Sequence, residues 1–528
     1  MLTGKNLIGY TISGEGSSIF PSSILIDETP TSHPFYEASE EEITTAANLA
    51  HEAFASYRHL SPGKKASFLE KIAEGIATSK EELVKMAMHE TNLPRPRLEG
   101  EVQRTINQLK LFAQLLKEGS WVNAIIDTAQ PERAPLPKPD IRQIQIPLGV
   151  VAVFGASNFP FAFSVAGGDT VSALAAGCPV VYKSHPGHPA TSEMTGAIII
   201  QAAKDSDVPE GVFSLLQGKS NQTSIGLVTH PLIKAVGFTG SLNGGKAIYD
   251  AAAKRTEPIP VYAEMGSTNP VFILPKILEE QRSILAEKLA ASNLLSAGQF
   301  CTNPGILVSI DSDNTQNFTN DFSSFISKAT ADSMLTESIY NNYNAGIQKL
   351  LETENVQVIA SGKENDVQKS ATAYMFHTTA DNFLSNGNLV HEVFGPASIH
   401  VTAATKEELF KIARKLPGQL TISIWGTEED LSENTALVQE LELKAGRIIF
   451  NNVPTGVEVT HAMVHGGPYP ATTDSRSTSV GTTAIYRFTR AVCYQNSPQE
   501  LLPDALKNEN PLHIWRQVNG AFLNGAIN

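Results

Sequence analysis

Short apolar segments that end in glycine or a small polar residue recur from Gly149 onwards, and they constrain the fold more than any other feature of the chain. They read LGVVAVFGA, PVVYKS, VFSLLQG, IKAVGFTG and IPVYAEMG, and helix-length stretches such as FAFSVAGGDTVSALAAG separate them. Strands that alternate with helices at this spacing predict βαβ units and a parallel sheet. Ligands of such sheets bind beyond the carboxyl ends of the strands. The residues that follow these strands are therefore the first candidates for a functional site.

Other patterns flank this region on both sides. Residues 40–116 have helical periodicity, which Pro94 and Pro96 interrupt. A proline-rich connector, PERAPLPKPD, comes next, and IRQIQI then alternates like an exposed strand. A second α/β region covers residues 269–450, and AIYRFTRAVCYQ, residues 484–495, predicts a long strand. The sequence predicts no role for the tail, residues 497–528.

Composition narrows the class of protein. The chain has 528 residues with 41% hydrophobic and 18% charged side chains, which is typical of a globular protein. Its net charge of −14 argues against nucleic acid or an anionic membrane as a partner, since both require a basic surface. The three cysteines have neither disulfide-framework nor metal-site spacing, and the first residues have no secretory pattern. We expect a cytoplasmic protein without a metal.

Three residues lie where chemistry is possible. Cys301, in GQFCTNPG, precedes a turn, although most free cysteines are simply small buried apolar residues. Glu264 ends the strand IPVYA, where a buried carboxylate is costly unless it is paired or used. Asn158, in FGASNFP, follows another strand and is otherwise an ordinary turn residue. None of the three is specific by itself.

Glycines and histidines give weaker signals. GFTGSLNGG follows a strand and opens a helix, so its amides could face a pyrophosphate, although it is not the G-x-G-x-x-G fingerprint. His461 and His465 are four residues apart, as zinc ligands on a helix would be. Ala462 stands where a zinc protease has glutamate, and two glycines follow His465. We interpret both histidines as loop or pocket-lining residues.

Taken together, these motifs resemble the aldehyde dehydrogenase superfamily. FGASNFP, GFTGS, AEMGSTNP, GQFCTNPG and HEVFGP occur in the family's order and approximate spacing, over nearly the whole chain. The resemblance implies that Cys301 attacks the aldehyde, that Asn158 stabilises the oxyanion and that Glu264 activates the water that hydrolyses the thioester. It also implies cofactor contacts at Lys183, Ser184, His185, Pro186, Gly218, Gly240, Ser241, Gly245, Glu392 and Phe394.

One departure concerns the choice of cofactor. NAD-preferring relatives often have glutamate three residues after the lysine, and this chain has Pro186 there. No carboxylate at that position would repel a 2′-phosphate, and Ser184 or His185 could help to hold it. We therefore expect NADP, with NAD as the possible alternative.

Within the superfamily, the chain looks most like the α-ketoglutarate semialdehyde (2,5-dioxovalerate) dehydrogenases, and a long-chain fatty aldehyde dehydrogenase branch shares much of the pattern. A substrate carboxylate would need a cation, for which Arg104 and Arg476 are candidates, although either could equally form a surface ion pair. Phe159 and Phe163 would line an apolar wall for both substrates. There are three other readings: a CoA-acylating dehydrogenase, a cysteine hydrolase and a catalytically inactive binding protein. Glu264 argues against the CoA-acylating enzyme, and the three intact catalytic residues argue against the inactive binding protein.

The resemblance implies an α/β architecture in three parts. A Rossmann-type cofactor domain takes residues 1–138 and 150–264, and an α/β catalytic domain takes residues 265–483. A small β bridging element takes residues 139–149 and 484–528, a range that includes the tail. In the family this element extends a partner's sheet, so we expect a homodimer or a homotetramer.

Overall fold

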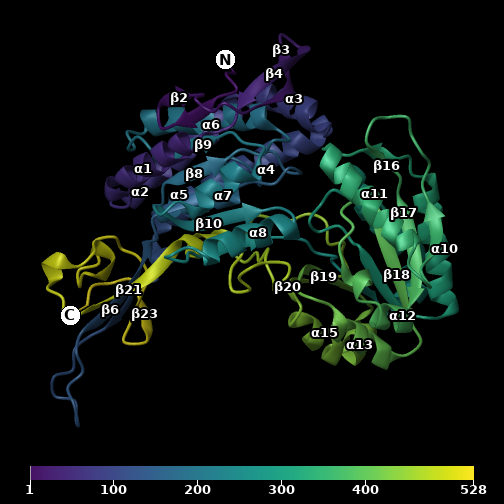
Figure 1. The fold of residues 1–528 in the computed structure, drawn as a ribbon. Helices are drawn as coiled ribbons and strands as arrows, with labels where there is room; N and C mark the ends of the chain where they lie inside the picture. Colours follow the sequence, from purple (N-terminus) through teal and green to yellow (C-terminus); the bar gives the residue numbers. More distant parts are fainter. Residues whose placement is uncertain (1, 528) are drawn as a thin grey trace.

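Two seven-stranded sheets, each covered by helices on both faces, form the larger parts of the computed structural model, which describes residues 2–527 (Figure 1). The first sheet contains, in spatial order, β11 (Val261–Glu264), β10 (Ile233–Thr239), β7 (Val150–Phe154), β8 (Val180–Lys183), β9 (Phe213–Leu216), β1 (Asn6–Ile8) and β2 (Thr11–Ser13). The five strands from β11 to β9 run parallel, as the sequence predicts, and β1 and β2 add an antiparallel edge.

Alternate side chains of the first sheet enter two separate cores. In β7, Val151 and Val153 pack into one core, and Val150, Ala152 and Phe154 pack into the other. The helices that cover the two faces are α1 (Glu40–Tyr57), α2 (Pro62–Thr78), α3 (Lys80–Thr91), α4 (Arg95–Glu118), α5 (Gly168–Ala176), α6 (Pro189–Asp205), α7 (Asn221–Thr229) and α8 (Leu242–Ala253). This double burial explains why the strands read as continuous apolar runs.

The second sheet is built in the same way. Its order is β15 (Gln357–Ser361), β17 (Tyr374–Thr379), β18 (Ala397–Ala403), β13 (Ile306–Ile310), β12 (Val271–Ile273), β19 (Gln419–Trp425) and β20 (Ala445–Phe450), and only β15 is antiparallel to its neighbour. Its helices are α9 (Pro275–Leu294), α10 (Asp313–Lys328), α11 (Glu337–Leu351), α12 (Ala380–Ser385), α13 (Lys406–Lys415), α14 (Glu428–Glu433) and α15 (Thr435–Glu442).

A smaller five-stranded sheet extends away from the first sheet (Figure 1). Its order is β21 (Thr489–Gln495), β6 (Ile141–Pro147), β5 (Ile125–Asp127), β22 (Arg516–Val518) and β23 (Ala521–Leu523). The tail, for which the sequence predicts no role, supplies β22 and β23. β5 also joins this sheet, although it belongs to the range that we assign to the cofactor domain.

The strand predicted for residues 484–495 begins later than expected. Residues Thr482–Phe488 form a 3-10 helix, and β21 starts at Thr489. The helical turn lets Ala484, Ile485 and Phe488 all enter the core, which a strand with alternating side chains could not do. Arg487, on the same turn, forms a buried ion pair with Asp169 at the start of α5.

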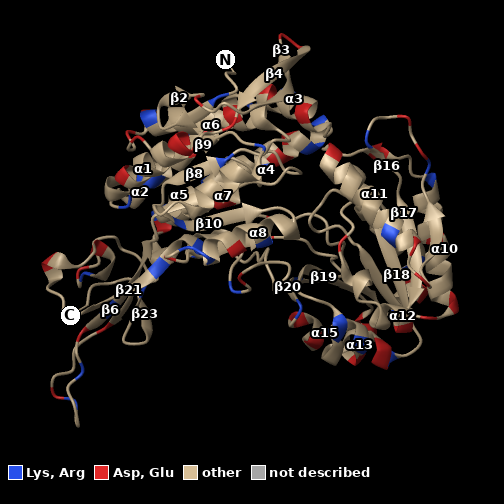
Figure 2. Cartoon of the chain, in the orientation of Figure 1, with Lys and Arg blue, Asp and Glu red and all other residues tan. Residues whose placement is uncertain are grey.

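Two further strand pairs complete residues 2–527. β3 (Ile19–Ile26) and β4 (Thr29–Tyr36) form an antiparallel hairpin. β14 (Asp332–Ser333) pairs antiparallel with β16 (Ser370–Ala371), although α11 and β15 lie between these two strands in the chain. Lys and Arg are interspersed with Asp and Glu over both larger parts in the view of Figure 2. None of the helices in residues 2–527 combines the length and the apolar character that a bilayer span requires.

Candidate active site

The chain crosses from the first sheet to the second immediately after Glu264. β11 ends at this residue, residues 265–270 form the crossover, and β12 starts the second sheet at Val271. The Glu264 side chain is buried, with only 3% exposed. The predicted carboxylate therefore lies at the carboxyl edge of the first sheet and at the junction with the second.

The segment around Cys301 is held by this crossover. Asn269 Nδ2 donates hydrogen bonds to the carbonyl oxygens of Cys301 and Asn303, each at 2.9 Å. Just before the cysteine, Ser296 and Ala297 have left-handed backbones with φ of 50° and 53°. Gly298 follows at φ 64°, and a Cβ there would lie 2.3 Å from the Gly395 carbonyl carbon. The loop before the cysteine is thus strained, and the crossover fixes its position.

Three reactive side chains meet in this place. His465 Nε2 lies 2.9 Å from Glu264 Oε1 and 3.5 Å from Cys301 Sγ. The Ser479 hydroxyl donates a hydrogen bond of 2.5 Å to the other oxygen of Glu264. We call Glu264, His465 and Cys301 the catalytic trio. A nucleophile, a base and a carboxylate in contact can support covalent catalysis.

The protonation of the trio follows from its burial. Burial alone would raise the pKa of Glu264, but His465 and the hydrogen bond from Ser479 more than offset it and lower this pKa. Burial, together with the negative charge of Glu264, raises the pKa of the Cys301 thiol well above its usual value. The resting site therefore holds an ionised carboxylate next to a protonated thiol, which needs a base to react.

Sequence reasoning missed His465 as a partner of the trio. We interpreted it only as a loop or pocket-lining residue, and the structure buries it completely between the two predicted catalytic side chains. Ser479 gave no signal at all. Both residues reach the site from a segment far along the chain, so local spacing could not place them. His461 lies apart from the trio and is exposed, with Nδ1 3.3 Å from the Thr482 hydroxyl.

Asn158 lies next to the cysteine loop. It follows β7, and its Nδ2 donates a 3.1 Å hydrogen bond to the Gln299 carbonyl. The two predicted wall residues are close by. The Phe159 ring centroid is 5.3 Å from that of Phe163 and 5.4 Å from that of Phe300, and the Phe163 ring lies 5.9 Å from His465. These aromatic rings form an apolar wall beside the thiol.

One face of α4 presents polar side chains to this wall. Arg97, Glu101, Arg104 and Gln108 recur at helical spacing, and each has at least one buried polar atom without a hydrogen-bond partner in residues 2–527. We call these four residues the α4 stripe. Unsatisfied buried donors and acceptors are rare in native proteins, and they often indicate a ligand site.

Arg104 is the most exceptional member of the stripe. Its guanidinium lies 5.0 Å from the centre of the Phe163 ring, and Nε donates to the Val457 carbonyl at 3.3 Å. Both terminal nitrogens are buried, and neither has a partner among the described residues. Arg476, the other predicted cation, is 89% exposed and pairs with Asp474 at 3.1 Å. Arg476 therefore forms the surface ion pair that was the alternative reading, and it does not belong to the site.

The edge of the first sheet also carries the predicted cofactor residues. Lys183 ends β8 and is followed by Ser184, His185 and Pro186. Burial lowers the pKa of Lys183 to about 8, and the described residues provide no ion pair for its ammonium group. The buried Ser184 hydroxyl also has no hydrogen-bond partner in residues 2–527. An unpaired cation beside a free hydroxyl suits an anionic or hydroxyl-rich ligand.

Three of the predicted cofactor residues at the carboxyl edge of the first sheet are glycines. Gly218 follows β9, and Gly240 follows β10. Ser241 caps α8 by accepting a hydrogen bond from the Gly244 amide at 3.2 Å, and Gly245 packs against Met265. The amino-terminal end of α8, with its free amides, therefore faces the carboxyl edge of the sheet, where it suits a pyrophosphate.

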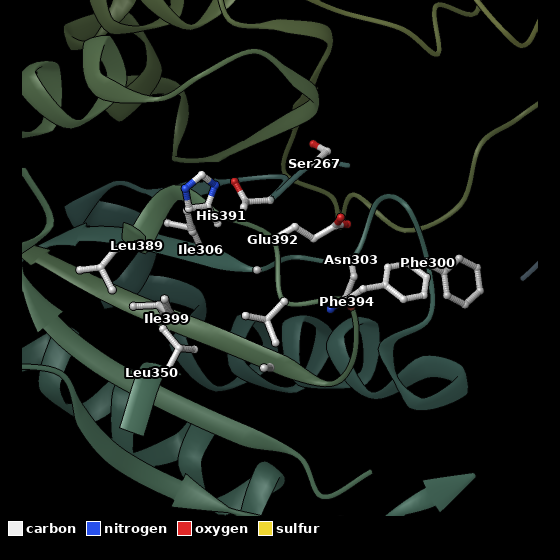
Figure 3. Close-up of a pocket in the computed structure, with 14 residues that line it drawn as sticks. Ser267, Phe300, Asn303, Ile306, Leu350, Leu389, His391, Glu392, Phe394 and Ile399 are labelled. Carbon is white, nitrogen blue, oxygen red and sulfur yellow. The ribbon is translucent and has the colours of Figure 1, made fainter. Parts of the chain in front are cut away.

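Glu392 and Phe394 approach from the second sheet. They lie on the loop before β18, beside Asn303 and Phe300 in the close-up of Figure 3. Glu392 Oε2 is 2.5 Å from the position that a Cβ on Gly266 would occupy, so only glycine in the crossover allows this approach. Lys183, the α8 terminus and Glu392 thus fit a nicotinamide dinucleotide, which would accept hydride between the two sheets.

Comparison with known proteins gives this geometry a context. Residues 28–488 match the aldehyde dehydrogenase family. The chain belongs to this family. As a family member it is an oxidoreductase that acts on small aldehydes and uses NAD(P), and its α/β fold agrees with the prediction from the sequence.

The similar proteins include enzymes with a named substrate. An alpha-ketoglutaric semialdehyde dehydrogenase of Acinetobacter baylyi is 47% identical, over 98% of this chain and 98% of its own length. Alpha-ketoglutaric semialdehyde dehydrogenase 2 of Azospirillum brasilense is 44% identical, over 98% and 99%. Betaine aldehyde dehydrogenase of Staphylococcus aureus in complex with NAD⁺ shares the fold with a TM-score of 0.76 at 17% identity, covering 94% of this chain and 98% of that one.

Proposed function

We propose that this protein oxidises α-ketoglutaric semialdehyde (2,5-dioxopentanoate) to 2-oxoglutarate with NADP. The observation that carries the substrate assignment is the Arg104 guanidinium, which is buried beside the aromatic wall with two unpaired nitrogens. A guanidinium with two free N–H groups recognises a carboxylate in a bidentate manner. The two relatives of nearly full length carry the name of this same activity.

Catalysis begins at the thiol. Cys301 Sγ attacks the aldehyde carbon as the thiolate, after the thiol proton has left to solvent, because His465 Nε2 carries the proton that faces Glu264 Oε1 at 2.9 Å and cannot accept a second one. The carbonyl oxygen becomes an oxyanion beside the Asn158 amide and the Cys301 backbone N–H. Preorganised donors of this kind typically lower the barrier by about 3 kcal/mol each. A nicotinamide dinucleotide held by Lys183, the α8 terminus and Glu392 would supply the hydride acceptor, and Cys301 would carry the acyl group as a thioester.

Hydrolysis of the thioester is assigned to Glu264. Its lowered pKa keeps it ionised, so it can accept a proton from an attacking water. Ser479 and His465 hold its two oxygens and fix the orientation of the carboxylate. This retained base supports release of a free acid and argues against transfer to CoA.

NADP is assigned on the segment after β8. Lys183 supplies a cation, Ser184 a free hydroxyl, and Pro186 no negative charge against a 2′-phosphate. Burial lowers the pKa of His185 well below its usual value, so this side chain is neutral. Its Nδ1 accepts a hydrogen bond from the Gly187 amide at 3.0 Å, which leaves Nε2–H free to donate to a phosphate oxygen.

Two sheet edges without a neighbouring strand support self-association. Among residues 2–527, β21 pairs with β6 alone, and β20 pairs with β19 alone. Unpaired strand edges are normally covered, and a second copy of the chain would cover both. We propose a homodimer or homotetramer, which light scattering of the purified protein measures, and a cytoplasmic location in keeping with three free cysteines.

A panel of aldehydes tests the proposal. The kcat/KM of the wild-type enzyme is measured for α-ketoglutaric semialdehyde and for decanal, each with NADP and with NAD. We expect a preference of about 10–100-fold for the keto acid, because a charge-assisted hydrogen-bonded pair contributes roughly 1.5–3 kcal/mol. A preference for decanal would instead assign the apolar wall of Phe159 and Phe163 to a long-chain aldehyde, and it would refute the role of Arg104. A higher kcat/KM with NAD would refute the cofactor assignment alone.

A further inference from the structure

We propose that the catalytic trio is also a binding site for a soft divalent metal ion, Zn²⁺ above all, and that the bound ion reversibly inhibits the enzyme. Glu264 Oε1, His465 Nε2 and Cys301 Sγ are three different types of zinc ligand. One ligand atom of each residue lies within 4.8 Å of the others. No other group of three such ligands occurs in residues 2–527. The oxidation itself uses no metal, so this site is additional to the proposed function and does not depend on the choice of substrate.

The distances agree with tetrahedral coordination. With Zn–S near ~2.3 Å and Zn–N near ~2.0 Å, the sulfur and nitrogen ligands of a tetrahedral zinc lie about 3.5 Å apart. Cys301 Sγ and His465 Nε2 are 3.5 Å apart without any rearrangement. His465 Nε2 and Glu264 Oε1 are 2.9 Å apart and would separate by a few tenths of an ångström, to about 3.3 Å. One coordination position remains for water.

The charges also balance. Coordination replaces the thiol proton, which is released to solvent, so the ion gains a thiolate, a carboxylate and a neutral imidazole. The complex of Zn²⁺ with these ligands has no net charge, and a neutral complex is far less costly in a buried site than an isolated ion. Arg104 lies close enough to interact with Cys301 and Glu264, and a neutral complex places no excess positive charge beside it.

Metal binding would stop the reaction at its first step. The sulfur lone pair that attacks the aldehyde would be bound to the ion, and the carboxylate that activates water would be occupied as well. Inhibition should therefore be competitive with the aldehyde and fully reversed by a chelator. Hard ions such as Mg²⁺ and Ca²⁺ prefer oxygen ligands and should have no effect at equal concentration.

Cobalt(II) provides a direct test, because it replaces zinc and is coloured. Full-length wild-type protein is titrated with Co²⁺, and bound Zn²⁺ is measured separately by equilibrium dialysis. We expect one ion per subunit and a thiolate-to-cobalt charge-transfer band. The band should vanish in Cys301→Ala, and the zinc Kd of His465→Phe, which keeps an aromatic ring next to Phe163, should rise at least about 100-fold, since even outer-shell partners of a metal contribute 10–100-fold. The matched control is Cys493→Ser, an exposed free cysteine, which should bind like the wild type.

Several results would overturn the proposal. Wild-type protein that binds Co²⁺ without a charge-transfer band would have no thiolate ligand, and this measurement requires no variant to fold. Zinc binding that persists in Cys301→Ala, or that is lost in Cys493→Ser, would place the ion elsewhere. An unchanged zinc Kd in His465→Phe with a native melting temperature would remove the histidine as a ligand.

Discussion

The catalytic trio and the α4 stripe are both buried and polar, and they lie on either side of the same aromatic wall, but their hydrogen bonding differs. In the trio, Ser479 donates a hydrogen bond to one oxygen of Glu264, and His465 Nε2 lies 2.9 Å from the other oxygen and 3.5 Å from the thiol, so the reactive groups contact one another even though Glu264 Oε1 and His465 Nδ1 accept or donate no regular hydrogen bond in residues 2–527. In the stripe, both terminal nitrogens of Arg104 and both polar atoms of the Gln108 amide have no partner in residues 2–527.

This difference indicates that the trio performs the reaction and that the α4 stripe selects the substrate. Groups that hold one another are preorganised and can act on any aldehyde that reaches Cys301. Groups without partners carry a desolvation cost that a complementary ligand relieves, so they discriminate between ligands. We therefore expect changes in the trio to affect all substrates and changes in the stripe to affect only charged ones.

Cys301→Ala should have the largest effect on the trio. Removal of a covalent nucleophile should lower kcat at least about 10⁴-fold for every aldehyde, because no other group can form the thioester. Steady-state kinetics measure this loss, and equilibrium NADP binding should stay unchanged as the control. Substantial turnover in this variant would refute the covalent mechanism.

Glu264→Gln should have the next largest effect, and it should separate the two halves of the reaction. Loss of the general base should lower steady-state kcat roughly 10²–10³-fold. Acylation should survive, so stopped-flow mixing should show a burst of about one reduced cofactor per active site, in line with an accumulating acyl-enzyme. A kcat equal to that of the wild type would rule out Glu264 as the base for hydrolysis.

His465→Asn should change the pH dependence of thioester hydrolysis. Burial raises the pKa of Glu264, and His465 is the strongest of the influences that lower it, so this pKa should rise in the variant. A protonated Glu264 cannot accept a proton from water, so the kcat of the variant should fall roughly 10–100-fold towards acidic pH, over a range in which the wild-type kcat stays constant. The pH profiles of kcat for the two proteins measure this difference. Parallel profiles for the two proteins would contradict this role.

The smallest expected effect concerns the cofactor edge. The pKa of Lys183 is lowered to about 8, so this side chain is charged below pH 8 and loses its charge above it. The Kd for NADP should therefore increase up to about 10-fold between pH 7 and pH 9, and the Kd for NAD should increase less. Lys183→Met should abolish the difference between the two pH values. An NADP affinity that is constant with pH would show that Lys183 does not contact the phosphate.

The sequence predicts the fold and part of the site for identifiable physical reasons. Apolar strands that end in glycine are local patterns, so β7, β8, β10 and β11 could be read directly. Asn158 follows such a strand after a few residues, Glu264 ends another, and Cys301 precedes a turn. His465 and Ser479 act through contacts between distant segments, which leave no local pattern. The same holds for the two arginines: Arg104 and Arg476 were equivalent candidates until burial separated them. The strand start was misplaced at residue 484 because alternation cannot reveal that three apolar side chains all turn inward.

The most direct test of the separation between trio and stripe is the kcat/KM of wild type and Arg104→Met for α-ketoglutaric semialdehyde and for pentanal, an aldehyde of equal chain length without a charge. Loss of a charge-assisted carboxylate contact should lower the value for the keto acid about 10–100-fold. The value for pentanal should change less than about 3-fold, since the trio remains intact. Arg476→Met, which removes an exposed arginine, is the matched control and should leave both values unchanged. If Arg104→Met lowers kcat/KM equally for both aldehydes, or for neither, the α4 stripe does not select the substrate. The account, in which the trio performs the reaction and the stripe selects the substrate, would then be wrong.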